Sequence, residues 1–160
     1  MKKVLRCALA GTVALTGITL APVAVSHFDD KEPLQSYRQS YWALVGANFG
    51  AMGAMVKGEI PWSDAQLKRY AEDLEALTEL DLLRGFAPGS EKGKTRAKPE
   101  IWENMADFEQ KFSDLQRAAD ALEEIVDDGG DRKAIAGAIG NVGKACKACH
   151  DDYKSKDYLY

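Results

Sequence analysis

A Cys-Lys-Ala-Cys-His run near the C-terminus, at residues 146–150, constrains the fold of this chain more than any other feature. Two cysteines separated by two residues and followed by a histidine are the attachment signature of c-type haem. Each thiol adds to one vinyl group, and the spacing lets both sulfurs reach adjacent edges of one porphyrin. His150 is then carried beneath the iron, where its imidazole can be an axial ligand. The motif predicts one haem c, attached through Cys146 and Cys149.

Three other interpretations of the motif remain open, namely a redox disulfide, half of a zinc site and a chance match. A structural zinc site needs four ligands, and only Cys7 and His27 lie outside the motif. A thioredoxin-like dithiol motif is expected in a βαβ context, which the sequence does not predict. We therefore favour haem attachment over these alternatives.

The first 26 residues have the pattern of a secretory signal peptide. Basic residues at positions 2–6 precede an apolar run over residues 7–21, and the small residues Ala24 and Ser26 fit the positions before a cleavage site. The apolar run is short for a membrane span. We interpret residues 1–26 as a secretory signal that is removed on export.

Cleavage would leave residues 27–160, enough for one domain with its own core. The chain has 21 basic and 25 acidic residues, and the signal holds three basic and no acidic ones. Residues 27–160 therefore contain 18 basic and 25 acidic residues, which gives a net charge of −7. This balance argues against nucleic acid or an anionic membrane as a partner. Because haem is joined to c-type apocytochromes outside the bacterial cytoplasm, we expect a periplasmic protein without membrane attachment after cleavage.

Four segments have apolar residues at the three- and four-residue steps of amphipathic helices. Ser63 and Asp131 precede two of these segments and Asp30 precedes a third, as N-cap residues commonly do. The stripe of the last segment includes both motif cysteines, with His150 beside them. We expect helices over residues 30–57, 63–85, 101–126 and 131–153.

The connections between these helices predict their arrangement. Two are short and one, over residues 85–99, is longer, which is typical of an antiparallel up-down-up-down four-helix bundle. The expected fold class is therefore all-α, with the covalent haem near the C-terminal helix. The inward residues expected of the first helix are Arg38, Trp42, Val45, Phe49, Met52 and Val56.

The chain resembles cytochrome c′, the high-spin class II c-type cytochromes, over essentially its whole length after the signal. The resemblance rests on Tyr-Arg-Gln-Ser at 37–40, Phe-Ala-Pro-Gly-Ser at 86–90, Lys-Pro-Glu-Ile-Trp at 98–102 and, most specifically, the run from 141 to 153 that contains the motif. It implies haem held by Cys146 and Cys149, with His150 as the proximal iron ligand. It also implies a homodimer formed through the first two helices.

The resemblance assigns four further residues to the haem propionates. Arg38 and Gln39 match positions next to the haem, where a guanidinium and an amide can pair with propionates. Thr95 and Arg96 lie in the long connection, where the resemblance implies reach to a propionate. A solvated helix residue is the alternative interpretation of Arg38.

Two more residues are assigned to the haem pocket in the same way. Trp42 matches the position that covers the distal face, and Phe86 matches one that packs against the pocket. Trp42 is larger than the residue common at its position. Lys154 stands where many family members have arginine, so a contact that needs a guanidinium is not expected there.

Iron coordination separates the candidate functions. An electron carrier usually holds its iron on both faces, often with histidine and methionine. No methionine follows His150, and Met52 lies ten residues beyond Trp42, about 15 Å along a helix. We therefore expect Met52 to fill the core and the iron to be five-coordinate.

An apolar sixth site disfavours water and anions but admits an uncharged diatomic molecule. The resemblance implies binding of nitric oxide and carbon monoxide, with little affinity for oxygen. The alternative function is an electron-transfer cytochrome with six-coordinate haem and a redox protein partner. An enzyme is not expected, because only a one-residue slip of register would bring an acid–base group, Tyr41, to the distal face. Tyr37, Tyr41 and Trp62 are compatible with a dimer interface.

Overall fold

The computed structural model describes residues 32–159, and the expected signal, its cleavage site and Asp30 lie outside this range. The described part contains helices and no strand, which confirms the all-α class. Its helices are α1 (Pro33–Lys57), α2 (Asp64–Thr78), the short 3-10 helix η1 (Leu83–Phe86), α3 (Glu100–Glu103), α4 (Met105–Asp127) and α5 (Arg132–Tyr153).

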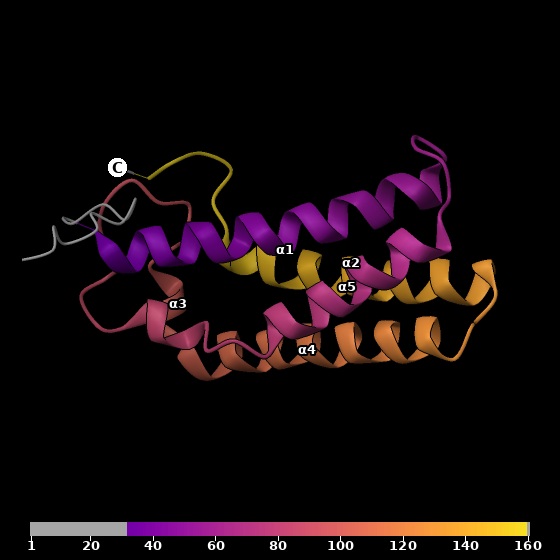
Figure 1. Ribbon diagram of the computed structural model, residues 1–160. Helices are drawn as coiled ribbons and strands as arrows, with labels where there is room; N and C mark the ends of the chain where they lie inside the picture. The colour runs from indigo at the N-terminus through magenta and orange to yellow at the C-terminus, as the bar shows by residue number, and fades with distance from the viewer. Residues whose placement is uncertain (1–31, 160) are drawn as a thin grey trace, which may run out of the picture.

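The four long helices alternate in direction along the chain and form the expected antiparallel bundle (Figure 1). Helix α1 packs mainly on α2, while α4 packs on both α2 and α5. The short helices η1 and α3 lie at the end of the bundle where α1 begins and α5 ends (Figure 1). None of the helices within residues 32–159 is long and apolar enough to cross a membrane.

Two of the expected N-caps are present, and the third, Asp30, lies outside the described residues. The Ser63 hydroxyl accepts a hydrogen bond from the backbone N–H of Gln66, and the Asp131 carboxylate accepts one from the N–H of Ala134 at 2.7 Å. Helix α1 begins at Pro33 with Glu32 at the N-cap position, and no side chain caps it. Proline suits this position because its fixed φ is helical and its missing N–H would have no helical acceptor.

The expected end of the second helix at residues 84–85 is wrong, since α2 ends at Thr78. The chain then turns so that Leu82 becomes fully buried while Leu80 stays half exposed. The hydrophobic gain from burying Leu82 favours this turn over further helix. The short helix η1 follows and delivers Phe86 to the core.

The third expected helix is interrupted at Asn104, which separates α3 from α4. The side-chain amide of Asn104 donates to the carbonyl of Glu100 at 3.2 Å, and its own carbonyl accepts from the N–H groups of Asp107 and Phe108. Such local side-chain bonds compete with continuous helix. The break lets α3 turn across the end of the bundle.

The expected inward stripes of α4 and α5 are largely confirmed, because the apolar residues of both helices form the core. In helix α1 the expected inward residues Arg38, Val45 and Met52 are buried, but the buried face is shifted from the expected one. Tyr41, expected beside the stripe, is 3% exposed, and Met55 is equally buried. Val56, expected inward, is 41% exposed. Burial of Tyr41 also removes it from the surface aromatics that could form a dimer interface.

Candidate functional site

A cavity of about 960 Å³ opens between α1 and the paired helices α4 and α5. It lies toward the end of the bundle that holds η1, α3 and the connection between them. Its volume is at the upper end of the range of about 300–1,000 Å³ common for small-molecule and cofactor sites. The structure brings all nine residues singled out in the sequence to its lining, and these are Arg38, Gln39, Trp42, Phe86, Thr95, Arg96, Cys146, Cys149 and His150.

Helix α5 presents the motif to this cavity. Cys146 and Cys149 are three residues apart and His150 is four beyond the first, so all three lie on neighbouring positions of one helix face. Both thiols are free and partly buried. No other cysteine or histidine occurs within residues 32–159.

The electrostatic surroundings keep all three motif side chains neutral at pH 7. Burial raises the pKa of Cys149 to about 11 and also raises the pKa of Cys146. Burial lowers the pKa of His150, and the positive charges of Lys154 and Arg96 lower it further. A neutral imidazole has a lone pair available for a metal.

Arg38 of α1 holds the connection that follows η1. Its guanidinium donates to the carbonyl of Ser90 at 2.9 Å, to the hydroxyl of Ser90 at 3.1 Å, and to the carbonyl of Gly85. Gly85 is needed there, because a Cβ on it would lie 2.9 Å from the ring of Tyr37. The guanidinium also lies over the ring of Phe86, 5.1 Å from its centroid. Local sequence could not reveal these contacts, because they join residues about 50 positions apart.

Arg38 is 3% exposed and forms no ion pair with a carboxylate within residues 32–159. Burial lowers its pKa, but arginine remains charged at neutral pH. A buried charge is costly unless an opposite charge or several hydrogen bonds compensate it. The hydrogen bonds to Gly85 and Ser90 satisfy donors of Arg38 but do not neutralise its charge, so the cavity that it lines is suited to an anionic group.

Aromatic side chains from α1, η1 and α4 form a wall of the cavity. Trp42 of α1 packs edge-on against Phe112 of α4, and both line the cavity. Phe86 packs against Phe108 with ring centroids 4.7 Å apart. The periodic stripe of α4 predicted that its aromatics would be inward, but not that they would line a cavity.

The neighbouring Tyr41 does not line the cavity, so the register slip that would make it a distal acid–base group is not found. Its hydroxyl is buried and has no hydrogen-bond partner within the described part of the chain. Met52 is fully buried and also lies away from the lining. No methionine of residues 32–159 is among the lining residues.

The long connection forms the rim. Thr95 is 4% exposed, and its hydroxyl accepts from the N–H of Ala97 at 3.1 Å. Arg96 donates through Nε to the carbonyl of Ser155 at 2.8 Å. The exposed amide of Gln39 donates to the carbonyl of Lys94 at 3.1 Å, so Gln39 contacts the connection as well as lining the cavity.

Two cavity-lining residues had no signal in the sequence. Lys111 forms ion pairs with Asp152 at 3.1 Å and with Asp107 at 3.6 Å, which ties α4 to α5 beside the motif. Tyr158 lies beyond the end of α5 and reaches the cavity from the C-terminal tail. Neither residue belongs to a motif, and only the packing of the chain places them there.

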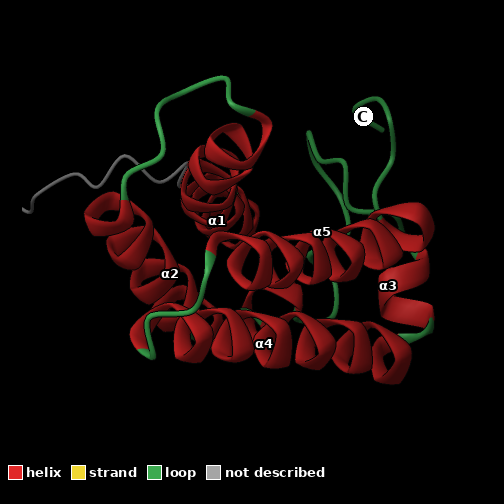
Figure 2. Ribbon diagram, turned by 90° about the vertical axis from the view of Figure 1, so that its right-hand side faces the viewer, coloured by secondary structure: helices red, strands yellow, loops and turns green. Residues whose placement is uncertain are grey.

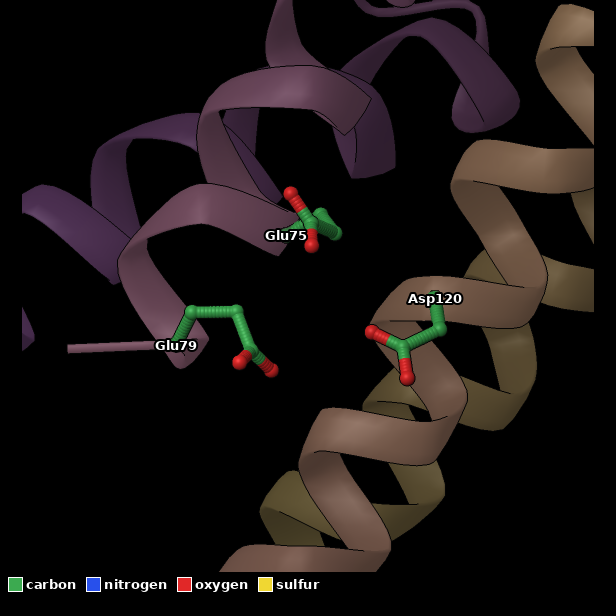
Figure 3. Close-up of side chains that lie close together, drawn as sticks. All are labelled: Glu75, Glu79 and Asp120. Atoms are coloured by element: carbon green, nitrogen blue, oxygen red, sulfur yellow. The ribbon is translucent and has the colours of Figure 1, made fainter.

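A separate group of carboxylates, outside the cavity lining, lies at α2 and α4. Glu75, Glu79 and Asp120 have carboxylate oxygens within 4.8 Å of one another (Figure 3). Glu79 and Asp120 are exposed and Glu75 is half-buried. Glu75 and Glu79 are a like-charge pair four residues apart, which weakens a helix slightly. Hydrated acidic groups of this kind are common on surfaces and do not by themselves form a metal site.

Comparison with known proteins identifies the family of this chain. The family model described as cytochrome c′ matches residues 34–154. Cytochrome c′ of Cereibacter sphaeroides is 38% identical over 148 residues, which cover 90% of this chain and 97% of that protein. The solved structure of cytochrome c prime from Shewanella frigidimarina has a TM-score of 0.74 and 39% identity, covering 81% of this chain and 99% of the other.

Other matched structures contain gaseous ligands. A variant of cytochrome c prime from Alcaligenes xylosoxidans, solved as its nitric oxide complex, is 40% identical with a TM-score of 0.70 and covers 81% of this chain and 99% of its own. Another variant of that protein was solved with carbon monoxide bound. A further cytochrome c′ structure is described as having an unusual ligand-controlled dimer dissociation.

Proposed function

The chain belongs to the cytochrome c′ family, whose members carry covalently attached haem c, and on that premise we propose that it is a periplasmic protein that binds small diatomic gases, chiefly nitric oxide. In this proposal the haem iron is five-coordinate, and the protein buffers or removes the gas. The observation that carries the proposal is the cavity, whose lining holds one imidazole, a set of aromatic side chains and no methionine of the described chain.

The residues of the cavity fit a haem. Cys146 and Cys149 are two free thiols on one helix face and would form the covalent links, while neutral His150 would be the proximal ligand. Arg38 is a buried cation without a carboxylate partner in the described chain, and a propionate would supply the opposite charge. Gln39, Thr95 and Arg96 lie on the same rim and would complete the polar surroundings.

When bound, the haem supplies an iron that can take one small ligand on the face away from the proximal histidine. Trp42, Phe112 and Leu115 line the cavity and offer an apolar surface that excludes water and hydrated anions. An uncharged diatomic molecule loses little hydration on entering such a space. The nitric oxide and carbon monoxide complexes of the matched Alcaligenes protein support the same ligand class here.

The alternative is an electron-transfer cytochrome with six-coordinate haem and a redox protein partner. That function needs a second strong iron ligand, and the lining residues of the described chain include no methionine and only one histidine. Redox activity by itself is compatible with both functions. A catalytic role needs a distal acid–base group, and Tyr41 lies outside the cavity lining. We therefore propose gas binding rather than enzymatic turnover.

We also propose that the protein is a homodimer formed through α1 and α2. Leu44 on α1 and Leu80 after α2 are 54% and 51% exposed. Burying exposed leucines of this kind favours association. The dimer named in a matched structure supports the proposal.

Optical and paramagnetic-resonance spectra of the exported holoprotein, with and without nitric oxide, test the proposed function. We expect a high-spin spectrum that changes on adding nitric oxide, and recovery of the protein in the periplasmic fraction. A Met52→Leu variant is the control and should keep the wild-type spectrum. A low-spin spectrum with a methionine–iron signature would support the electron carrier, and a colourless protein after maturation would refute both functions.

A further inference from the structure

The chain continues beyond α5 and pairs with the rim of the cavity. The N–H of Ser155 donates to the carbonyl of Arg96 at 2.8 Å, and the N–H of Leu159 donates to the carbonyl of Thr95 at 3.0 Å. The Nε–H of Arg96 returns a hydrogen bond to the carbonyl of Ser155 at 2.8 Å. We call residues 155–159 the C-terminal strap.

One end of this pairing is anchored in the body of the protein, next to the end of α5. Lys98 donates its backbone N–H to the carbonyl of Tyr153 at 3.0 Å, and its ammonium group donates to the carbonyls of Asp151 and Asp152 at the end of α5. Ala97 and Lys154 form an antiparallel bridge. Figure 2 shows the tail and the connection between η1 and α3 running beside each other beyond the end of α5.

Tyr158 is the strap residue that lines the cavity. Its side chain is 56% exposed, and the ammonium group of Lys94 lies 5.3 Å from its ring centroid. A tyrosine suits a rim because its ring is apolar while its hydroxyl stays in water. The next residue, Leu159, bonds to the carbonyl of Thr95, so Tyr158 stands at the part of the rim formed by Lys94 and Thr95.

The strap lies beyond the part of the chain that the family model matches. The match to the family model ends at residue 154. The last residues of a domain are usually poorly ordered unless hydrogen bonds or packing hold them. Here Ser155 and Leu159 are held to two residues, Thr95 and Arg96, that themselves line the cavity.

We propose that the C-terminal strap orders the rim segment at Thr95 and Arg96 and, through Tyr158, closes the edge of the cavity beside Lys94 and Thr95 against water. The ordering of the rim is independent of the bound group. The closure rests on the proposed function, because the group sheltered from water is the haem. Without the strap, the end of α5 and the rim would be joined only by the contacts of Ala97 and Lys98.

Hydrogen exchange of the holoprotein tests the ordering of the rim. We expect the amides of Ser155 and Leu159 to be protected. Leu159→Pro removes one donor and should speed exchange at Ser155 about fivefold, the equivalent of one backbone hydrogen bond of about 1 kcal/mol. Leu159→Ala keeps the donor and is the matched control. Unprotected amides in the wild type, or equal exchange at Ser155 in both variants, would refute the proposal that the strap orders the rim.

Relaxation of solvent protons by the ferric iron tests the closure, because it reports how closely water approaches the metal. Tyr158→Ala should increase the relaxation rate per iron, while Tyr158→Phe should leave it at the wild-type value. An unchanged rate in Tyr158→Ala would refute the closure. A protein without haem would instead refute the proposed function, and the exchange experiment would still decide whether the strap orders the rim.

Discussion

The indole of Trp42 packs edge-on against the phenyl ring of Phe112, with ring centroids 6.5 Å apart and planes at 89°. Trp42 comes from α1 and Phe112 from α4, and both line the cavity. This contact therefore joins the wall of the cavity formed by α1 to the wall formed by α4. A ligand that enters between them must displace one of the rings.

We expect Trp42→Ala to accelerate carbon monoxide binding to the ferrous holoprotein by about fivefold, because an edge-to-face contact of about 1 kcal/mol no longer opposes entry. Stopped-flow or flash-photolysis kinetics would measure the rate. Trp62→Ala is the control, since Trp62 is partly buried but does not line this cavity. Unchanged kinetics in Trp42→Ala would mean that another residue gates the cavity.

Arg38 is expected to stabilise the fold through its forked guanidinium. Lysine cannot reproduce the hydrogen bonds to both Ser90 and Gly85, so Arg38→Lys should lower the free energy of unfolding by about 2 kcal/mol. Denaturant unfolding of the holoprotein would measure the loss. Arg84→Lys is the control, because the exposed Arg84 stacks on Tyr37 and should cost much less. Equal losses in both variants would contradict the role of Arg38.

Removal of the buried hydroxyl of Tyr41 is expected not to destabilise the protein. It has no hydrogen-bond partner in the described part of the chain, and burial raises its pKa. Tyr41→Phe should therefore leave stability unchanged or raise it by up to about 1 kcal/mol. Tyr37→Phe should lower stability, because it removes the 2.8 Å hydrogen bond from the Tyr37 hydroxyl to the carbonyl of Asp81. A clear loss of stability in Tyr41→Phe would show that its hydroxyl is satisfied in solution.

The raised pKa of Tyr153 leads us to expect that the folded protein loses stability at high pH. Burial, together with the 2.6 Å hydrogen bond to Asp107, raises its pKa from 10 to about 12. Between these values the unfolded chain releases the phenolic proton while the folded chain keeps it, so rising pH favours unfolding. We expect the melting temperature to fall between pH 10 and 12 more steeply in the wild type than in Tyr153→Phe. Parallel curves would mean that Tyr153 does not couple to folding.

The sequence by itself determined the parts of this protein that depend on local chemistry. The motif spacing identified the haem cysteines and histidine as candidates, and the periodic stripes predicted four long helices. Ser63 and Asp131 were recognised as caps from their residue types and positions, and in the structure each accepts a hydrogen bond from an N–H three residues later. Such signals lie within one or two helical turns, where sequence spacing fixes geometry.

Only the tertiary structure decided what depends on distant segments. Leu82 ends α2 early because the core is there to receive it, and the shifted buried face of α1 includes Tyr41 instead of Val56. Arg38 reaches Ser90 across 52 positions, and Arg96 reaches Ser155 across 59. No local pattern encodes these pairings, because they form only when the bundle brings the helix ends together and buried polar groups must find partners.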